Sequence, residues 1–272
     1  MQSLVGVSVV SLAINLPGPL AAARLTDLGA AVTKVEPPNG DPLAGAAPEW
    51  YSDLVRRQMV VTLDLKDRAD RAKLDVLLAE ADLLITSMRP SALVRLGLDE
   101  LQTSFPRLSV VEIVGYDGER TEVPGHDLNY QAAHGILTPP AMPKVPFADL
   151  LGAERAVSAA LAALIARANS GVGQRRRVVL EHAAAFAANA VRYRLTGEGA
   201  VLGGAFPGYG IYRCADGYVA LGAIEQQMFA RTVATFGVDG SRPGFEQAFA
   251  TLTIEQLKTM ATGADIPLNE VR

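Results

Sequence analysis

Two residues of this sequence are well suited to moving protons. His126 is one of only three histidines among the 272 residues, and it lies in the Gly/Pro-punctuated segment 124–130. Functional side chains concentrate in such turns. Asp149 directly precedes a long Ala/Leu-rich run that predicts a helix. A histidine and a carboxylate that converge on one cleft can act as an acid/base pair, so we take both residues as candidate catalytic groups.

Each candidate also has a structural interpretation. His126 fits an ordinary loop histidine, and Asp149 fits a helix N-cap, whose carboxylate accepts hydrogen bonds from first-turn amides. The helix dipole favours the ionised form of Asp149, which makes it a competent base or nucleophile. Glu225 follows a predicted strand and heads a predicted helix, so it is either a capping residue or a functional carboxylate.

Other common site chemistries find no matching motif. The turn at 17–19 reads Pro-Gly-Pro and lacks the three glycines of a dinucleotide fingerprint, although Glu36 lies where a ribose-binding acid would be. The sequence has no P-loop and no Gly-x-Ser-x-Gly hydrolase motif. His134, His182 and the single Cys214 lack the spacing of zinc or iron ligands. We therefore expect neither a nucleotide redox cofactor nor a metal.

The composition is that of an ordinary globular protein. Hydrophobic residues make up 49% and charged residues 20% of the chain, and the net charge is −4. An acidic balance argues against nucleic acid as the main partner, because phosphate binding requires a basic surface. No apolar run reaches the roughly 20 residues that span a bilayer, and residues 1–15 read as a buried strand rather than a signal peptide. We expect a cytoplasmic protein without a membrane partner.

The first two thirds of the chain alternate between strands and helices. Apolar, β-rich runs predict strands at residues 4–10, 31–35, 59–65, 81–86, 107–113 and 178–180. Helical spacing predicts helices at residues 20–28, 68–80, 90–96, 150–169 and 181–191. Residues 39–51 read as a looser, Gly/Pro-rich segment. This order predicts a doubly wound, Rossmann-like parallel α/β domain.

The pattern changes after a glycine-rich segment at 197–210, a plausible linker. Two short strands flank a turn at 215–217, which predicts a hairpin. Residues 225–236 and 254–261 predict two helices. We therefore expect a large α/β domain and a smaller α+β domain, at residues 1–198 and 199–272.

A series of short segments, taken in order and spacing, resembles a known family nearly from end to end. Those near the start read Gly-Pro-Leu-Ala, Lys-Val-Glu-Pro-Pro and Gly-Asp-Pro, at residues 18–21, 34–38 and 40–42. Others lie at residues 28–30, 63–66, 89–90, 95–98, 163–164 and 170–174. The family they resemble is that of the class III coenzyme A transferases and α-methylacyl-CoA racemases.

The resemblance implies one of two reactions. Transferases of the family use an aspartate as a nucleophile, which forms an acyl anhydride and then an enzyme thioester. Racemases use the equivalent aspartate together with a histidine, as two bases on opposite faces of the α-carbon. Asp149 matches the aspartate of both branches. His126, within Gly-His-Asp, and Glu225, within Gly-Ala-Ile-Glu, match the racemase branch, in which the glutamate supports the histidine.

The leading hypothesis is therefore an epimerase that acts on 2-methylacyl-CoA thioesters through an enolate. Backbone N–H groups at the start of the Asp149 helix are expected to stabilise the enolate charge. One alternative is an acyl-CoA:carboxylate CoA-transferase with Asp149 as nucleophile, toward which Pro37 leans. Another is a non-catalytic partner subunit of a hetero-oligomer.

The resemblance also implies the ligand and the assembly. Coenzyme A is expected as part of the substrate, with no separate cofactor. Arg56 and Arg89 are expected near its phosphates or adenine, because guanidinium groups suit both. Family members usually continue with a segment that returns to the large domain and interlocks two subunits, and this sequence ends at Arg272 without it. We expect a homodimer or a heterodimer with another family member.

Overall fold

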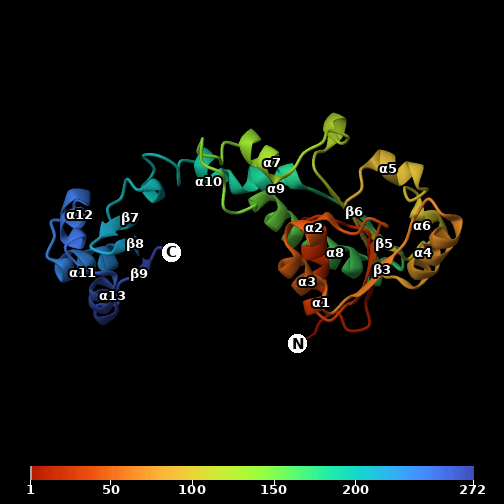
Figure 1. Ribbon diagram of the computed structural model, residues 1–272, viewed down its shortest axis with the longest axis horizontal. Helices are drawn as coiled ribbons and strands as arrows, with labels where there is room; N and C mark the ends of the chain where they lie inside the picture. The colour runs from red at the N-terminus through yellow and green to blue at the C-terminus, as the bar shows by residue number, and fades with distance from the viewer. Residues whose placement is uncertain (1) are drawn as a thin grey trace. The chain divides into compact units, whose positions relative to one another are not determined.

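The computed structural model describes residues 2–272 and divides the chain into two compact units, Met1–Ala188 and Asn189–Arg272 (Figure 1). This division precedes the glycine-rich segment 197–210 that the sequence suggests as a linker. Among the described residues, no helix combines the length and the apolar character needed to cross a membrane.

The first unit is built on a six-stranded parallel sheet with the strand order β3-β2-β1-β4-β5-β6. Its strands are β1 (Ser8–Ser11), β2 (Ala31–Glu36), β3 (Met59–Thr62), β4 (Leu83–Thr86), β5 (Ser109–Val114) and β6 (Arg175–Val179). The order reverses between β1 and β4, which is the switch point where doubly wound sheets bind ligands. The predicted Rossmann-like α/β fold is confirmed.

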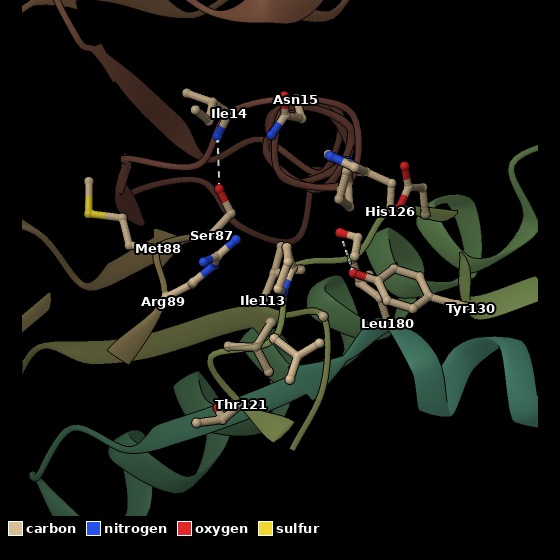
Figure 2. A pocket seen from close by; sticks show the side chains of 17 residues that line it. Ile14, Asn15, Ser87, Met88, Arg89, Ile113, Thr121, His126, Tyr130 and Leu180 are labelled. Atoms are coloured by element: carbon tan, nitrogen blue, oxygen red, sulfur yellow. Dashed lines mark hydrogen bonds between the residues drawn. The ribbon is translucent and has the colours of Figure 1, made fainter. Parts of the chain in front are cut away.

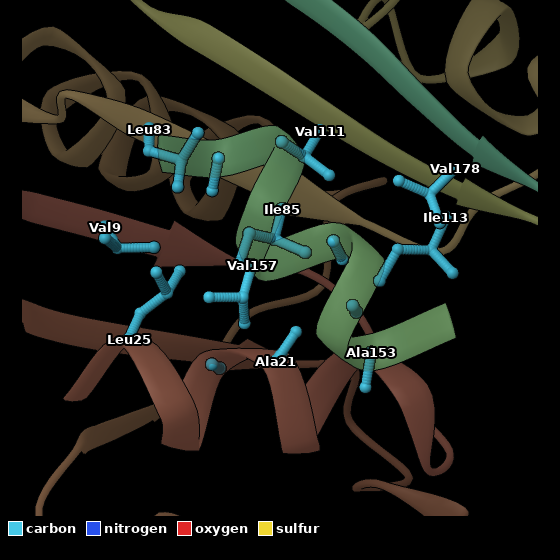
Figure 3. Close-up of a cluster of buried hydrophobic side chains, with 14 of the residues drawn as sticks. Val9, Ala21, Leu25, Leu83, Ile85, Val111, Ile113, Ala153, Val157 and Val178 are labelled. Atoms are coloured by element: carbon cyan, nitrogen blue, oxygen red, sulfur yellow. The ribbon is translucent and has the colours of Figure 1, made fainter. Parts of the chain in front are cut away.

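Helices cover both faces of this sheet. They are α1 (Pro17–Asp27), α2 (Pro42–Ala46), α3 (Pro48–Val55), α4 (Arg68–Glu80), α5 (Pro90–Arg95), α6 (Leu101–Ser104), α7 (Asp127–Ala133), α8 (Phe147–Ser170) and α9 (Leu180–Ala187). Because successive strand residues point to opposite faces, Val9 packs with α1 and α8 (Figure 3), whereas Val10 packs with Leu74 of α4. Because all six strands are parallel, the residues that follow them lie at the same edge of the sheet, between the helix layers on its two faces.

Two segments are more helical than the sequence patterns indicate. Residues 39–51 form α2 and α3, because Asp41 caps α2 by accepting the Leu43 amide at 3.0 Å. Pro42 and Pro48 occupy the first helical positions, where a missing N–H costs nothing. The turn around His126 continues directly into α7.

The second unit is a three-stranded antiparallel sheet with helices against it. Its elements are α10 (Asn189–Arg192), β7 (Tyr209–Cys214), β8 (Gly217–Gly222), α11 (Gln226–Phe236), α12 (Arg242–Ala250), α13 (Ile254–Gly263) and β9 (Leu268–Glu270). The predicted β7–β8 hairpin is present. Helix α12 and strand β9 lie where the sequence patterns indicate neither, and Phe245 and Phe249 of α12 form the centre of the core. The unit is the α+β structure expected.

Candidate active site

A cavity of about 200 Å³ opens at the carboxyl ends of β1, β4 and β5 (Figure 2). Its lining includes Asn15 after β1, Arg89 after β4 and Tyr130 of α7. Both proton-moving candidates from the sequence, His126 and Asp149, line it as well. The structure therefore brings together the N-cap residue of α7 and a residue in the first turn of α8.

The backbone of His126 is fixed from both sides. Its N–H donates to Asn129 Oδ1 at 3.0 Å, and its carbonyl accepts the Asn129 amide at 2.9 Å. The Tyr130 hydroxyl donates to the Gly125 carbonyl at 2.7 Å. Glycine suits position 125, because a Cβ there would meet ring atoms of Tyr116 and Tyr130 at 2.7 and 2.8 Å and one of the rings would have to shift. The imidazole itself is exposed.

Asp149 is not the N-cap of its helix. The N-cap of α8 is Pro146, and Asp149 lies inside the first turn. The acceptor for this helix start is Asp127, whose Oδ1 accepts the amides of Ala148 at 2.7 Å and Asp149 at 3.2 Å. The capping interpretation of Asp149 is therefore wrong, because its carboxyl group does not accept the first-turn amides of α8.

The same contacts overturn the expected enolate donors. The Ala148 and Asp149 amides are taken by Asp127, and those of Phe147 and Leu150 donate to the carbonyls of Val145 and Pro146. The backbone N–H groups of residues 147–150 therefore all have acceptors within the protein and are not free to bind a substrate oxygen. The expectation that these amides stabilise an enolate is therefore not met by the structure.

Burial, and then the negative charge of Asp127, raise the pKa of Asp149 to about 7. The sequence reasoning expected the helix dipole to keep this carboxyl ionised. The dipole is outweighed here because removal from water disfavours the charged form more strongly. A carboxyl group with a pKa near 7 can both accept and donate a proton at neutral pH.

A second cavity, of about 340 Å³, lies beside the first at the ends of β2 and β3. Its lining is mainly apolar and includes Pro37, Pro38, Leu63 and Leu65. The two cavities share four residues, Ile14, Asn15, Ser87 and Met88. The two cavities therefore adjoin at these four residues.

The remaining candidates lie in different places. Arg89 is exposed and lines the 200 Å³ cavity. Arg56 ends α3, with its side chain 73% exposed and 3.8 Å from Asp53, and it lines neither cavity. Glu225 is the N-cap residue of α11 in the second unit, yet its side chain makes no capping hydrogen bond. The roles of Arg56, Arg89 and Glu225 stay predictions.

Sequence reasoning did not assign a role to Asp127, Tyr130 or Asn15. For Asp127, its position next to His126 in the sequence could have indicated a role in the site. No local pattern indicates the contact of Asp127 with α8, because 21 residues separate it from Ala148. Within residues 2–272, no group of three or more His, Cys, Asp or Glu side chains is arranged to hold a metal ion.

The comparison with known families decides the relationship. The model of CoA-transferase family III matches residues 4–272. The chain belongs to CoA-transferase family III. Human alpha-methylacyl-CoA racemase is 29% identical over 288 residues, which cover 94% of this chain and 73% of the relative. Acetyl-CoA:oxalate CoA-transferase of Acetobacter aceti is 33% identical over 187 residues, which cover 62% of this chain and 48% of the relative.

Solved structures share the family III fold. The crystal structure of Rv3272 from M. tuberculosis superposes with a TM-score of 0.84 at 24% identity, covering 100% of this chain and 83% of that chain. The match to the Acetobacter enzyme spans about half of that relative's length. Both a racemase and a transferase are thus among the relatives.

Proposed function

We propose that this family III protein acts on acyl-CoA thioesters and epimerises the α-carbon of 2-methylacyl-CoA through an enolate. The observation that supports the proposal is the placement of His126, the N-cap residue of α7, and Asp149 of α8 on the lining of one cavity. A transferase needs only the carboxylate, whereas epimerisation needs a second group that exchanges protons.

The proposed reaction moves one proton on and one proton off the α-carbon. The thioester carbonyl acidifies the α-hydrogen. Ionised Asp149 accepts this proton while the electron pair moves toward the thioester oxygen, and protonated His126 then donates a proton to the opposite face. The reverse reaction starts with protonated Asp149 and neutral His126. Because the pKa of Asp149 is about 7, both starting forms of this residue are populated at one neutral pH.

Coenzyme A is proposed to span the two cavities, with no cofactor apart from the substrate. The apolar second cavity suits the adenine, and the 200 Å³ cavity takes the thioester. The exposed guanidinium of Arg89 suits a phosphate or a carbonyl oxygen. Arg56 remains a weaker candidate because it lines neither cavity. A second subunit, identical or from another family member, is part of the proposal.

The second candidate function is CoA transfer to a carboxylic acid. It is favoured by one observation, that Asp149 is the single carboxylate among the residues lining the catalytic cavity. Its ionised oxygen would attack the thioester carbonyl, releasing the CoA thiolate and leaving an acyl anhydride. The resemblance to a transferase at 33% identity is consistent with this reaction.

The deciding experiment is mass spectrometry of separate (2R)- and (2S)-2-methylacyl-CoA in deuterated water. The expected result is a gain of about one mass unit at the α-carbon, together with loss of optical purity. His126→Ala should abolish racemisation but keep exchange for the enantiomer whose proton faces Asp149, and Asp149→Asn should show the opposite preference. Racemisation at the wild-type rate in His126→Ala would contradict the proposal.

A labelled carboxylic acid, added with unlabelled acyl-CoA, separates the two functions. Label appearing in the CoA thioester, without α-deuteration, would support transfer. The same reaction with Asp149→Asn is its control, because both functions need that carboxylate.

A further inference from the structure

Asn15 lies at the switch point of the sheet with an unusual backbone. Its φ of 70° places it in the left-handed region, which few non-glycine residues occupy. It follows β1 and precedes α1, so its side chain emerges where β1 and β4 end (Figure 2). Strained backbone at such a position is a reason to look for a functional side chain.

This conformation is held by a buried polar network. The backbone N–H of Asn15 donates to Asp41 Oδ1 at 2.9 Å. The other oxygen of Asp41 accepts from Lys34 Nζ at 2.7 Å, and Lys34 is fully buried and also donates to the Ala13 carbonyl at 3.0 Å. Next to Asn15, the Ile14 amide donates to Ser87 Oγ at 3.1 Å. These hydrogen bonds hold the backbone of Ile14 and Asn15 in place after β1.

The side chain of Asn15, in contrast, is left without a partner. Within residues 2–272, no hydrogen bond involves its side-chain nitrogen or oxygen, and the residue is exposed. Of the four residues that the two cavities share, Ile14 and Met88 are apolar, and the Ser87 hydroxyl already accepts the Ile14 amide. The Ser87 O–H remains available as a donor, but among the four shared residues Asn15 is the polar side chain that makes no hydrogen bond, and it presents both an N–H donor and a carbonyl acceptor where the cavities meet.

We propose that Asn15 is a substrate-positioning residue that hydrogen-bonds an amide of the pantetheine arm of coenzyme A. This inference rests on the proposed function, which puts the adenine in one cavity and the thioester in the other. The part of the ligand that leads to the thioester is the pantetheine arm, whose secondary amides each offer one N–H and one C=O. A primary amide side chain matches both.

The test compares Asn15→Gly with the wild type. Glycine adopts the left-handed conformation freely, so this variant keeps the backbone and removes only the side chain. Isothermal titration with 2-methylbutanoyl-CoA is expected to give a roughly tenfold higher Kd for the variant, since one hydrogen bond is lost. Titration with ADP, which lacks the arm, should give equal Kd values for both proteins. Asn15→Asp, which also tolerates this backbone, provides a second variant without the N–H donor.

Kinetics separate positioning from structure. With 2-methylbutanoyl-CoA, KM should rise while kcat stays within about twofold. With the S-ethyl thioester, which has no amide, kcat/KM should be the same in both proteins. An unchanged Kd and KM in a folded Asn15→Gly variant would overturn the inference. In that case, α-proton exchange by the wild type would still support the proposed function. Failure of the wild type to bind 2-methylbutanoyl-CoA would overturn both.

Discussion

Asp127 accepts the backbone amide of Asp149 at 3.2 Å, although it neighbours His126 in the sequence. The same oxygen accepts the Ala148 amide at 2.7 Å, and the other accepts from Gln131 Nε2 at 2.5 Å. One buried carboxylate thus joins the helix that presents His126 to the helix that presents Asp149. The spacing of the two proposed bases depends on this side chain as much as on the sheet.

The charge of Asp127 can be separated from its hydrogen bonds. Asp127→Asn keeps an oxygen for the two amides and removes a negative charge that raises the pKa of Asp149. We expect the acid limb of kcat/KM for α-proton exchange to move to lower pH, by about half a unit to one unit, because burial, the larger cause, remains. A limb at the wild-type pH would show that this charge does not act on Asp149. Asp127→Ala, which also loses the acceptor, should in addition destabilise the fold by about 1–2 kcal/mol.

The pKa of Asp149 predicts how stability depends on pH. The folded-state value of about 7 exceeds the ordinary 3.8, so between these values the folded protein holds a proton that the unfolded chain has lost. This group therefore lowers stability as pH rises from about 4 to about 7, and its cost is fully present above 7. Asp149→Asn should thus be more stable than wild type at pH 8, on the order of 2 kcal/mol after allowance for partial exposure. The two proteins should unfold alike near pH 3.5 in urea titrations, and an equal difference at both pH values would contradict the assignment.

The fold of the first unit was predictable because its signals are local. Strands such as β5 are buried on both faces and read as continuous apolar runs. Helix α12 was not predicted although Ser241 gives it a local N-cap, because the helix depends on the core contacts of Phe245 and Phe249, which its spacing does not show. Tertiary packing supplies most of the stability of so short a helix.

The site was predictable only in part, for a similar reason. Residue types and the family resemblance point to His126 and Asp149. Neither reveals that Asp149 is largely removed from water or that Asp127 lies beside it, so the dipole argument for an ionised Asp149 fails. The left-handed backbone of Asn15 likewise depends on Asp41, which lies 26 residues away. Electrostatics of this kind follow from contacts between distant segments, which sequence spacing does not encode.

The His126 turn is predicted to be sensitive to volume at position 125. Gly125→Ala places a methyl group against the rings of Tyr116 and Tyr130, at 2.7 and 2.8 Å from ring atoms. These rings pack edge to face at 5.1 Å, so neither can move aside without loss. We expect a destabilisation of about 1–3 kcal/mol and a fall in kcat for exchange of at least tenfold, measured by urea unfolding and deuterium incorporation.

Tyr130→Phe, a milder change next to position 125, is the control for Gly125→Ala. Tyr130→Phe keeps the ring and removes only the 2.7 Å hydrogen bond to the Gly125 carbonyl. It should cost about 1 kcal/mol of stability and reduce kcat less than Gly125→Ala does. Wild-type kcat in a folded Gly125→Ala protein would mean that the position of His126 does not limit the reaction.

The buried pair Lys34–Asp41 is predicted to be costly to break. Both side chains are fully buried, and Nζ lies 2.7 Å from Asp41 Oδ2 and 3.6 Å from Glu36 Oε1. Lys34→Met leaves two carboxylates in the interior without their cation, so the free energy of unfolding should fall by about 3–5 kcal/mol. Adding Asp41→Asn should recover part of this loss, because the amide still accepts the Asn15 and Leu43 N–H groups without carrying a charge. Lys73→Met is the matched control: that lysine is exposed, its pair with Asp70 lies in solvent, and urea unfolding should show no measurable change. A loss from Lys34→Met no larger than from Lys73→Met would show that the network does not hold the segment carrying Asn15.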